Sequence, residues 1–264
     1  MNFSYNNTTN SRSNKPILIS IEGNIGSGKS TLVKKLEEKF NKKDLKICFL
    51  QEPVNEWSEI KDENDITILE NYYNNQKKYA FQFQMMAYIT RLKTLRDVLG
   101  VHEPCNYDII ITERSVYTDK YVFAKMLFDS DKISKIEYDI YNRWFNEFLK
   151  DLPQQHIIYL KTKPSIAFER VKIRARKGEE IPLEYLEECH KYHQNWLKQD
   201  KLGPNVPPLI RSLSENHTLL IDGNINIFQN EQHLNECILN ISNFIVNIIK
   251  ADRSKEEYFE VGKW

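Results

Sequence analysis

The sequence predicts an α/β fold in which one parallel sheet of five strands is flanked by helices. Five short segments rich in apolar and β-branched residues alternate with longer helical patterns. A glycine-rich loop joins the first strand to the first helix. The chain has 264 residues, of which 41% are hydrophobic, and this suits one large domain. We expect the domain at residues 16–250, between a disordered tail of residues 1–15 and a loose charged tail of residues 251–264.

A phosphate loop is predicted between the first strand and the first helix. Residues 16–22 are apolar enough for a buried strand, and residues 30–40 place their apolar side chains on one helical stripe. Between them, residues 23–30 match G-x-x-x-x-G-K-[S/T] at every fixed position. The glycines let backbone N–H groups turn onto a polyphosphate at the positive end of the helix. The residues expected to bind the phosphates are Gly23, Asn24, Ile25, Gly26, Ser27, Gly28, Lys29, Ser30 and Thr31.

The remaining strands and helices follow in alternation. Further strands are predicted at residues 46–51, 107–112, 155–161 and 217–222. Further helices are predicted at residues 66–99 with an interruption near 74–75, 116–128, 134–151, 165–174, 183–201 and 230–250. The strand at 107–112 is the most hydrophobic, so we expect it to lie centrally in the sheet. Residues 203–208 are rich in proline and predict a loop.

Composition narrows the possible partners and compartments. Basic and acidic residues number 37 each, so the net charge of zero gives no indication of a nucleic-acid or membrane-surface partner. The four cysteines are widely spread without a C-x-x-C pair, which predicts neither a zinc site nor a disulfide framework. No apolar run suits a membrane span, and the first residues lack the apolar core of a signal peptide. We expect a cytoplasmic location, with a mitochondrial transit peptide as the alternative because residues 1–14 contain no acid.

Charged side chains follow the predicted second and third strands. Glu52 comes directly after the second strand, and Glu113 and Arg114 follow the third. Ligands of open parallel sheets bind beyond the carboxyl ends of the strands, so these side chains should face the site. Residues 170–177 form a basic cluster that is either a solvated helix face or, as we favour, a clamp for phosphates.

Several of these features coincide with a known pattern. The sequence contains G-N-I-G-S-G-K-S at 23–30, E-P-V-x-x-W at 52–57, F-Q at 83–84, E-R-S-V-Y at 113–117, R-x-R at 174–176 and P-L-E-Y-L at 182–186. Together they resemble the deoxynucleoside kinase family over about residues 16–250. The likeness is greatest to the deoxyguanosine and deoxycytidine kinase branch, because Asp119 stands where thymidine-preferring members usually have a small residue.

The resemblance implies a P-loop kinase fold with an arginine-rich lid at about residues 174–182. It implies that the protein uses ATP, with Mg²⁺, to phosphorylate the 5′-hydroxyl of a deoxynucleoside. Glu52 matches the family's general base, Arg114 holds that base and the reacting hydroxyl, and Lys29 serves the phosphates of ATP. The residues implied for Mg²⁺ and for the lid are Ser30, Glu113, Arg174 and Arg176.

The same resemblance assigns the deoxynucleoside site. Tyr73 would bind the 3′-hydroxyl of the sugar together with Glu179, a role that Glu180 could take because the lid looks one residue shorter than in close relatives. Three polar residues would read the edge of the base, and two aromatic residues would sandwich its ring. The residues implied for the base are Gln84, Arg91, Asp119, Phe83 and Phe123, and those implied for lining the pocket are Val54, Trp57, Leu69 and Ala87.

Base preference and assembly are finer expectations. An arginine donates to O6 and N7 of guanine and a carboxylate accepts from an N–H group, so Arg91, Asp119 and Gln84 suit deoxyguanosine best. Deoxyadenosine and deoxycytidine come next, and thymidine comes last because its methyl group would crowd Arg91. The resemblance also implies a homodimer, to which the helices at 66–99 and 134–151 could contribute.

Two other classes of protein share the phosphate loop. A nucleoside monophosphate kinase shares the fold and the lid, but its phosphate acceptor requires cations rather than Glu52. A regulatory nucleotide switch requires a well-placed N-K-x-D motif, whereas the one at residues 41–44 lies too close to the phosphate loop to reach a base. We therefore favour a kinase that acts on a deoxynucleoside.

Overall fold

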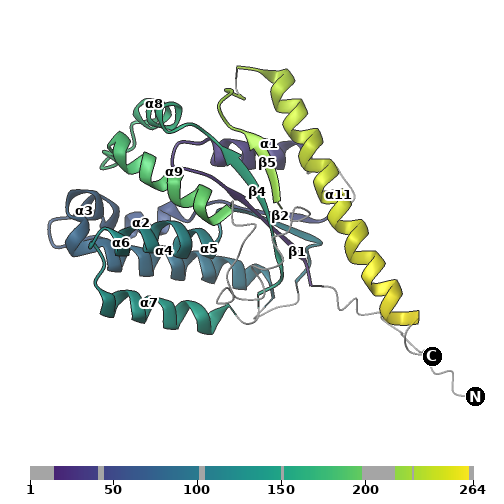
Figure 1. Cartoon of the computed structure of the whole chain (residues 1–264), viewed down its shortest axis with the longest axis horizontal. Helices are drawn as coiled ribbons and strands as arrows, with labels where there is room; N and C mark the ends of the chain where they lie inside the picture. The colour runs from purple at the N-terminus through teal and green to yellow at the C-terminus, as the bar shows by residue number, and fades with distance from the viewer. Residues whose placement is uncertain are drawn as a thin grey trace, which may run out of the picture.

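The computed structural model describes residues 15–40, 45–100, 105–149, 152–197, 218–227 and 229–261. Five parallel strands form one sheet in the order β2-β3-β1-β4-β5 (Figure 1). The strands are β1 (Ile17–Glu22), β2 (Ile47–Leu50), β3 (Ile109–Glu113), β4 (Gln155–Lys161) and β5 (Thr218–Asp222). The predicted parallel sheet is confirmed. Residues 1–14 of the predicted tail, the N-K-x-D turn and the loop at 203–208 fall outside the described residues.

In the strand order, β1 lies where successive strands begin to be added on the other side of the sheet. From β1 the chain goes to β2 and β3 on one side and then crosses to β4 and β5 on the other. The hydrophobic β3 lies inside the sheet, between β2 and β1. Ligands of open α/β sheets bind outside the carboxyl ends of the strands at such a point. The phosphate loop follows β1 directly and therefore lies at this position.

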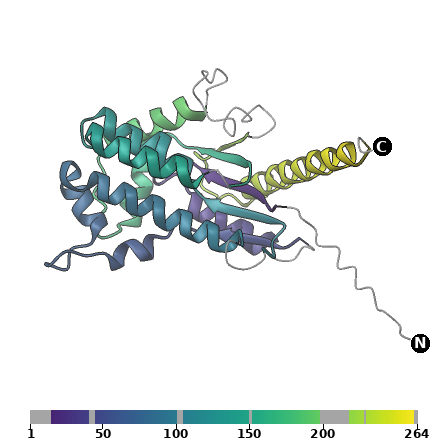
Figure 2. The ribbon, with the colours of Figure 1, turned by 90° about the horizontal axis from the view of Figure 1, so that it is seen from below.

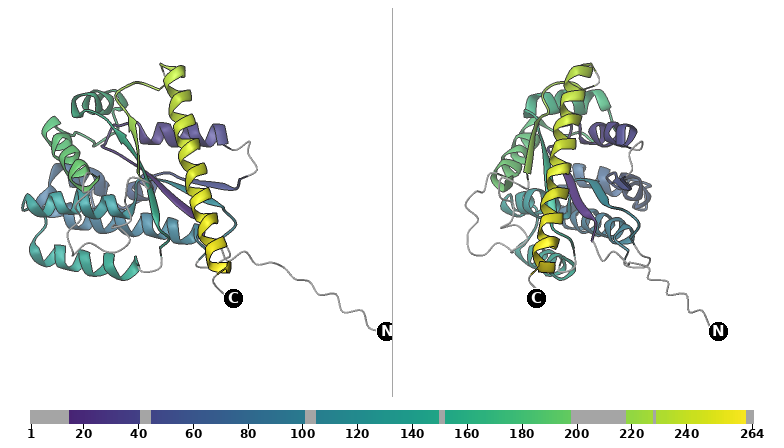
Figure 3. Two further views of the ribbon diagram at one scale, coloured as in Figure 1. Left: turned by 45° about the vertical axis from the view of Figure 1, so that its right-hand side comes forward. Right: turned by 90° about the vertical axis from the view of Figure 1, so that its right-hand side faces the viewer.

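One face of the sheet is covered by α1 (Lys29–Phe40) and α11 (Glu231–Val261) (Figure 3). Successive residues of a strand point to opposite faces, so Ile19 and Ile21 of β1 both face these helices. They pack in one cluster with the apolar stripe of α1, which includes Leu36. This packing fixes the direction of α1 and hence the place of the phosphate loop at its start.

The opposite face carries α4 (Gln76–Val98), α7 (Lys135–Phe148) and α9 (Leu183–Leu197) (Figure 1). Tyr88 of α4 and Tyr141 of α7 are buried, and their ring centroids lie 5.8 Å apart. Their packing holds α4 and α7 side by side.

The predicted interruption near residues 74–75 is confirmed. α3 (Ile68–Asn74) ends there, and the side chain of Asn75 accepts a hydrogen bond from the Lys78 N–H in the first turn of α4. A further short helix, α2 (Val54–Glu59), lies between the predicted strand at 46–51 and the predicted helix at 66–99, where no helix is predicted from the sequence. Its six residues are too few for a helical pattern to be recognised. The buried Trp57 is the side chain that anchors it.

The predicted helix at 116–128 is three consecutive segments. They are α5 (Val116–Thr118), the π-helix η1 (Asp119–Ala124) and α6 (Lys125–Asp129). A π-turn contains one more residue than an α-turn and often occurs at a functional site. Asp119 and Phe123, four residues apart, both line the cavity described below. The hydrophobic pattern does not reveal the π-turn because one additional residue in a single turn changes the spacing of the buried residues too little to be recognised in a short helix.

The C-terminal helix is longer than predicted. α11 continues to Val261, through residues that we expected to form a loose tail. No glycine or proline occurs between residues 231 and 261, so local propensity gives the helix no reason to end at residue 250. Figure 2 shows this end of α11 projecting past the sheet. Within the described ranges, no helix combines the length and apolar character that a membrane span requires.

Candidate active site

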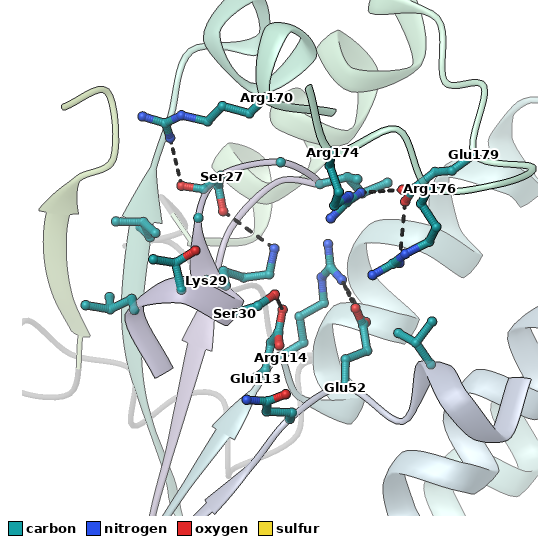
Figure 4. A pocket seen from close by; sticks show the side chains of 18 of the residues that line it. Ser27, Lys29, Ser30, Glu52, Glu113, Arg114, Arg170, Arg174, Arg176 and Glu179 are labelled. Carbon is teal, nitrogen blue, oxygen red and sulfur yellow. Dashed lines mark hydrogen bonds and ion pairs between the residues drawn. The ribbon is translucent and has the colours of Figure 1, made fainter. Parts of the chain in front are cut away.

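A cavity of about 580 Å³ opens at the carboxyl edge of the sheet. Every residue that the resemblance implies for the deoxynucleoside lines it, as do residues 25–31 of the phosphate loop and both lid arginines. Gly23 and Asn24 do not line it. Figure 4 shows the phosphate-loop side chains and the lid on opposite sides of one space, with Glu52 and Arg114 between them. The fold therefore brings the residues predicted to bind ATP and those predicted to bind the deoxynucleoside into one cavity.

Two glycines fix the path of the phosphate loop. Gly26 has a φ of 75°, and a Cβ atom there would lie 2.4 Å from the carbonyl oxygen of Ala167. Gly23 has a φ of 151°, and its Cβ atom would lie 2.6 Å from the carbonyl oxygen of Leu160. A side chain fits neither place, so the loop packs directly on β4 and on α8 (Pro164–Arg174).

The side chain of Asn24 supports the loop from behind. Its amide nitrogen donates to the Leu186 carbonyl at 2.8 Å, and its Oδ1 accepts from the Ile25 N–H at 2.8 Å. Leu186 belongs to α9, so this helix holds the phosphate loop in place. The sequence assigns Asn24 to phosphate binding, whereas its side chain ties two parts of the fold together.

Lys29 is a buried amine at the start of α1. Its Nζ donates to the Asn24 carbonyl at 2.7 Å. Burial and the nearby charge of Arg114 lower the pKa of Lys29 to about 7. A phosphate beside the amine would favour the ammonium form, so nucleotide binding should raise this pKa.

Ser30 and Glu113 bring two side-chain oxygen atoms together at the end of the phosphate loop. The Ser30 hydroxyl donates to Glu113 Oε1 at 2.6 Å. Mg²⁺ prefers oxygen ligands and is commonly held by one or two protein oxygens together with the phosphates of a nucleotide. The pair has the chemistry and the place that such an ion requires.

Glu52 lies in a cluster of ion pairs within the cavity. Its carboxylate accepts hydrogen bonds from Arg114 Nη1 at 2.7 and 2.8 Å and from Arg91 Nη2 at 2.9 Å. Burial alone would raise the pKa of Glu52, but the charges of Arg114, Arg91 and Lys29 outweigh it and hold the pKa well below its ordinary value. Glu52 is therefore ionised at neutral pH and can accept a hydrogen bond from a hydroxyl group.

Arg91 connects Glu52 to the part of the cavity predicted to read the base. Its Nε donates to Asp119 Oδ2 at 2.9 Å, and its Nη1 donates to the Glu113 carbonyl at 2.8 Å. Burial disfavours the charged guanidinium, but the charges of Asp119 and Glu52 outweigh it and raise the pKa of Arg91. Nearby, Gln84 Oε1 is buried and has no hydrogen-bond partner among the described residues. It is an acceptor suited to an N–H group of a ligand.

Arg114 combines strained backbone with spare hydrogen-bond donors. Its φ is 61°, in the left-handed region, and its N–H donates to the Ile21 carbonyl at 3.0 Å. Its guanidinium lies 5.2 Å from the centroid of the Phe123 ring. Within the described part of the chain, its buried Nε and Nη2 atoms have no hydrogen-bond partner. Arg114 can therefore hold Glu52 and still donate to a ligand.

Aromatic side chains form one wall of the cavity. Phe83 packs edge-on against Trp57 with ring centroids 5.4 Å apart, and it stacks on Tyr72 at 4.5 Å. Burial raises the pKa of Tyr73 well above its ordinary value, so this tyrosine keeps its hydroxyl proton. The Tyr72 and Tyr185 hydroxyl oxygens lie 2.7 Å apart. A mainly apolar wall of aromatic rings suits the ring of a nucleobase.

The lid arginines are paired with Glu179. Arg174 Nη2 lies 2.6 Å from Glu179 Oε2, and Arg176 Nη1 lies 3.8 Å from Glu179 Oε1. The Glu179 side chain is 4% exposed and lines the cavity, whereas Glu180 is exposed and does not line it. Of the two acids that the sequence leaves open, Glu179 is the one that reaches the site.

Comparison with known proteins decides the family. The deoxynucleoside kinase family matches residues 19–246. The chain belongs to this family. Deoxycytidine kinase 2 of Gallus gallus is 33% identical over 248 residues, which cover 87% of this chain and 90% of that protein. A probable deoxycytidine kinase of fowlpox virus is 38% identical over 187 residues, covering 69% and 72%. The mitochondrial deoxyguanosine kinase of Xenopus laevis is 31% identical over 235 residues, covering 79% and 86%.

Membership of the deoxynucleoside kinase family confirms the P-loop kinase fold and decides against the two rival classes. The chain is an enzyme that transfers a phosphoryl group from ATP to a deoxynucleoside.

Some residues of the kinase site were not recognised from the sequence. Arg170 Nη1 donates to the carbonyls of Ser27 at 3.1 Å and Gly223 at 2.8 Å, so it ties the phosphate loop to the segment after β5. Tyr72 and Tyr185 both line the cavity. In the sequence, only the basic cluster at 170–177 drew attention to Arg170. Tyr72 and Tyr185 lie far apart in the sequence, so no motif indicates that they lie in the same cavity.

The pH dependence of ATP binding to this kinase should report on Lys29. Its pKa is about 7 in the free enzyme, and bound phosphates raise it, so binding above pH 7 takes up a proton. We expect the Kd for ATP to change little below about pH 7 and to rise by up to about tenfold per pH unit above it. Calorimetric titrations across this pH range provide the measurement.

Lys29→Arg is the matched control because the guanidinium stays charged over the whole range. Dividing the Kd of the native protein by that of the variant cancels the ionisation of ATP itself. A ratio that is the same at every pH would show that Lys29 does not titrate in this way.

Proposed function

We propose that this deoxynucleoside kinase phosphorylates the 5′-hydroxyl of deoxyguanosine, using ATP bound with Mg²⁺. The observation that supports this most is the cluster in which Arg91 pairs with both Glu52 and Asp119. In this cluster Glu52 would accept from the reacting hydroxyl, and Arg91 and Asp119 would supply a donor and an acceptor for the nucleobase, all within one cavity. Deoxyguanosine carries the hydroxyl, the O6 and N7 acceptors and the N–H donors that these groups would bind.

Glu52 is the proposed general base. It is held ionised by its two arginine partners and would accept the proton of the 5′-hydroxyl. That oxygen attacks the γ-phosphorus, and the bond from the γ-phosphorus to ADP breaks. In a loose transition state the hydroxyl loses its proton late, so the position and charge of Glu52 matter more than its basicity.

Positive charges on several sides of the cavity support phosphoryl transfer. Lys29 lies in the phosphate loop, Arg114 has buried N–H groups to spare, and the lid contributes Arg174 and Arg176. These groups would stabilise the charge spread over the transferred phosphoryl oxygens. Ser30 and Glu113 are the proposed Mg²⁺ ligands. When bound with ATP, Mg²⁺ neutralises part of the phosphate charge.

Polar groups in the other half of the cavity would hold the nucleoside. Tyr73 and Glu179 are proposed to bind the 3′-hydroxyl of the sugar. Gln84 Oε1, which lacks a partner among the described residues, would accept from an N–H group of guanine. Arg91 and Asp119 would pair with the remaining acceptor and donor atoms of the base edge.

Deoxycytidine is the second candidate substrate. The names of the relatives in Gallus gallus and fowlpox virus favour it. A carboxylate and an amide can also accept the amino protons of cytosine. Deoxyadenosine ranks beside it, and thymidine ranks last because its methyl group would lie against the charged Arg91.

Replacing the proposed base gives a direct test of the mechanism. Glu52→Gln keeps the shape and one acceptor but removes the charge, so we expect kcat to fall by about 10²–10⁴-fold. Deoxynucleoside binding should survive, since the other polar groups remain. Steady-state kinetics and calorimetry measure the two effects. Glu59→Gln, at an exposed position in α2, the helix that follows Glu52, serves as the control. A kcat for Glu52→Gln within about threefold of the native value would remove Glu52 from the role of base.

Competition between the four deoxynucleosides tests the base preference. With ATP and Mg²⁺ present, we expect kcat/KM to decrease from deoxyguanosine to deoxyadenosine and deoxycytidine and then to thymidine. Chromatography of the monophosphate products gives the four rates in one mixture. Thymidine as the best substrate would show that the roles given to Arg91 and Asp119 are wrong.

We also propose that the kinase is a homodimer. The outer face of α7 carries Ile136, Ile140 and Trp144, which are 74%, 40% and 48% exposed and lie one helical turn apart. Ile89 of the neighbouring α4 is 48% exposed. These exposed apolar side chains on two adjacent helices mark the surface that we propose for the second subunit.

Trp144→Glu should turn the dimer into a monomer, because it places a charge in the middle of the proposed interface. Leu239→Glu is the control, since Leu239 is 59% exposed on α11, on the other side of the sheet. Light scattering at micromolar concentration gives the mass of each variant. A monomeric native protein, or a dimer that both substitutions leave intact, would contradict the proposed interface.

A cytoplasmic location completes the proposal. The four cysteines, Cys48, Cys105, Cys189 and Cys237, are all free, which suits a reducing compartment. The mitochondrial relative of Xenopus laevis gives the alternative. Fractionation of cells that express the full chain distinguishes the two locations.

A further inference from the structure

The lid turn rests directly on the side chain of Glu70 in α3. Gly178, in the turn that follows the lid arginines, has a φ of 73°. A Cβ atom on Gly178 would lie 2.0 Å from Glu70 Cγ and 3.1 Å from Glu70 Cβ. Only a glycine permits this approach. The next residue is Glu179, which pairs with both lid arginines.

Glu70 is not free to move away from this contact. Its Oε2 accepts hydrogen bonds from the Thr67 N–H at 2.9 Å and from the Thr67 hydroxyl at 2.8 Å. The bond from the Thr67 N–H, together with a bond of 3.2 Å from the Glu70 N–H to Thr67 Oγ1, forms the capping box that starts α3. Its Oε1 lies 3.3 Å from Lys177 Nζ, and its side chain is only 14% exposed. Glu70 is therefore a fixed support, and a shift of the lid turn would have to be matched by a shift of α3.

The same helix lines the nucleoside half of the cavity. Leu69, Tyr72 and Tyr73 of α3 all line it. The Tyr72 hydroxyl also lies 2.7 Å from the hydroxyl of Tyr185 in α9, the helix that follows the lid. α3 thus contacts the lid at its turn and just beyond its end. The same short helix, of seven residues, contributes three side chains to the nucleoside half of the cavity.

We propose that Glu70 and Gly178 are positioning residues whose contact couples deoxynucleoside binding to the docking of the lid over the phosphates of ATP. A nucleoside that contacts Tyr73 and Leu69 would restrict the motion of α3. Through Glu70, α3 would then support the lid turn at Gly178, next to Glu179 and the lid arginines. The inference rests on the proposed function, since it assigns the lid arginines to ATP. Coupling of this kind is reciprocal, so each ligand must tighten the binding of the other by the same factor.

The coupling factor provides the test. We would measure the Kd of a non-hydrolysable ATP analogue with Mg²⁺ by calorimetry, alone and with a saturating amount of the deoxynucleoside that binds most tightly. We expect the native protein to show a coupling of about fivefold or more. In Gly178→Ala the added Cβ meets Glu70, so we expect the coupling to fall below about twofold. The Kd of each ligand alone should stay within about threefold, since neither ligand by itself requires the docked lid.

Three further variants separate the contact from other effects. Glu70→Ala removes the support and should also abolish the coupling. Glu70→Gln keeps the capping bonds and the shape and should retain it. Lys177→Ala should retain it as well, because the Lys177 side chain is 92% exposed and its ion pair contributes little. A loss of folding would instead weaken the binding of each ligand alone.

The coupling factors of the four variants distinguish a docking contact from its absence. Loss of coupling in Gly178→Ala and Glu70→Ala, with retention in Glu70→Gln and Lys177→Ala, supports the docking contact. Coupling that persists in both of the first two variants overturns it, and so does its absence from the native protein. A protein that binds none of the four deoxynucleosides would overturn the proposed function itself, a result that is distinct from binding without coupling.

Discussion

Two buried arginines and the carboxylates that balance them are the constraint on which this site depends. Arg91 and Arg114 are almost fully buried, and a buried charge is tolerated only when it is paired. Glu52 pairs with both arginines, and Asp119 pairs with Arg91. Glu52 lies just after β2, Arg91 in α4, Arg114 directly after β3 and Asp119 at the start of η1. Their charges balance only if all these elements meet at the carboxyl edge of the sheet.

This arrangement gives one network two tasks. Arg91 contacts the carboxylate proposed for catalysis and the carboxylate proposed for base recognition. Glu52 and Asp119 together fix the position of Arg91. A substitution at Asp119, on the side of the nucleobase, should therefore also change the position of Glu52 relative to the reacting hydroxyl. Arg114 keeps two buried N–H groups without a partner among the described residues. The four charged side chains are therefore held in place by their own ion pairs, and Arg114 can still donate hydrogen bonds to a ligand.

The sequence predicts most of what depends on local pattern. The five strands, the phosphate loop and the carboxylate of Glu52 follow from apolar periodicity, one motif and the rule for the edge of a parallel sheet. The roles of Gln84 and Asp119 required a family resemblance, because no local pattern marks them. The structure places these residues at the cavity, while the roles themselves stay predictions.

What could not be predicted depends on contacts between distant segments. The π-turn at Asp119 covers only six residues, which are too few for its register to be recognised in the hydrophobic pattern. Asn24 and Arg170 bond to carbonyls more than 50 residues away, which no spacing in the sequence reveals. The extension of α11 to Val261 is different, since the lack of glycine and proline there was visible in the sequence.

A double-mutant cycle of Glu52→Gln and Asp119→Asn tests most directly whether Arg91 joins catalysis to base recognition. The cycle would compare kcat/KM of the native enzyme, the two single variants and the double variant, each converted to a free energy of the transition state. If the two carboxylates share Arg91, the effects should be non-additive by about 0.5–3 kcal/mol. Effects that add to within about 0.3 kcal/mol would show that the two carboxylates act independently and would contradict the account.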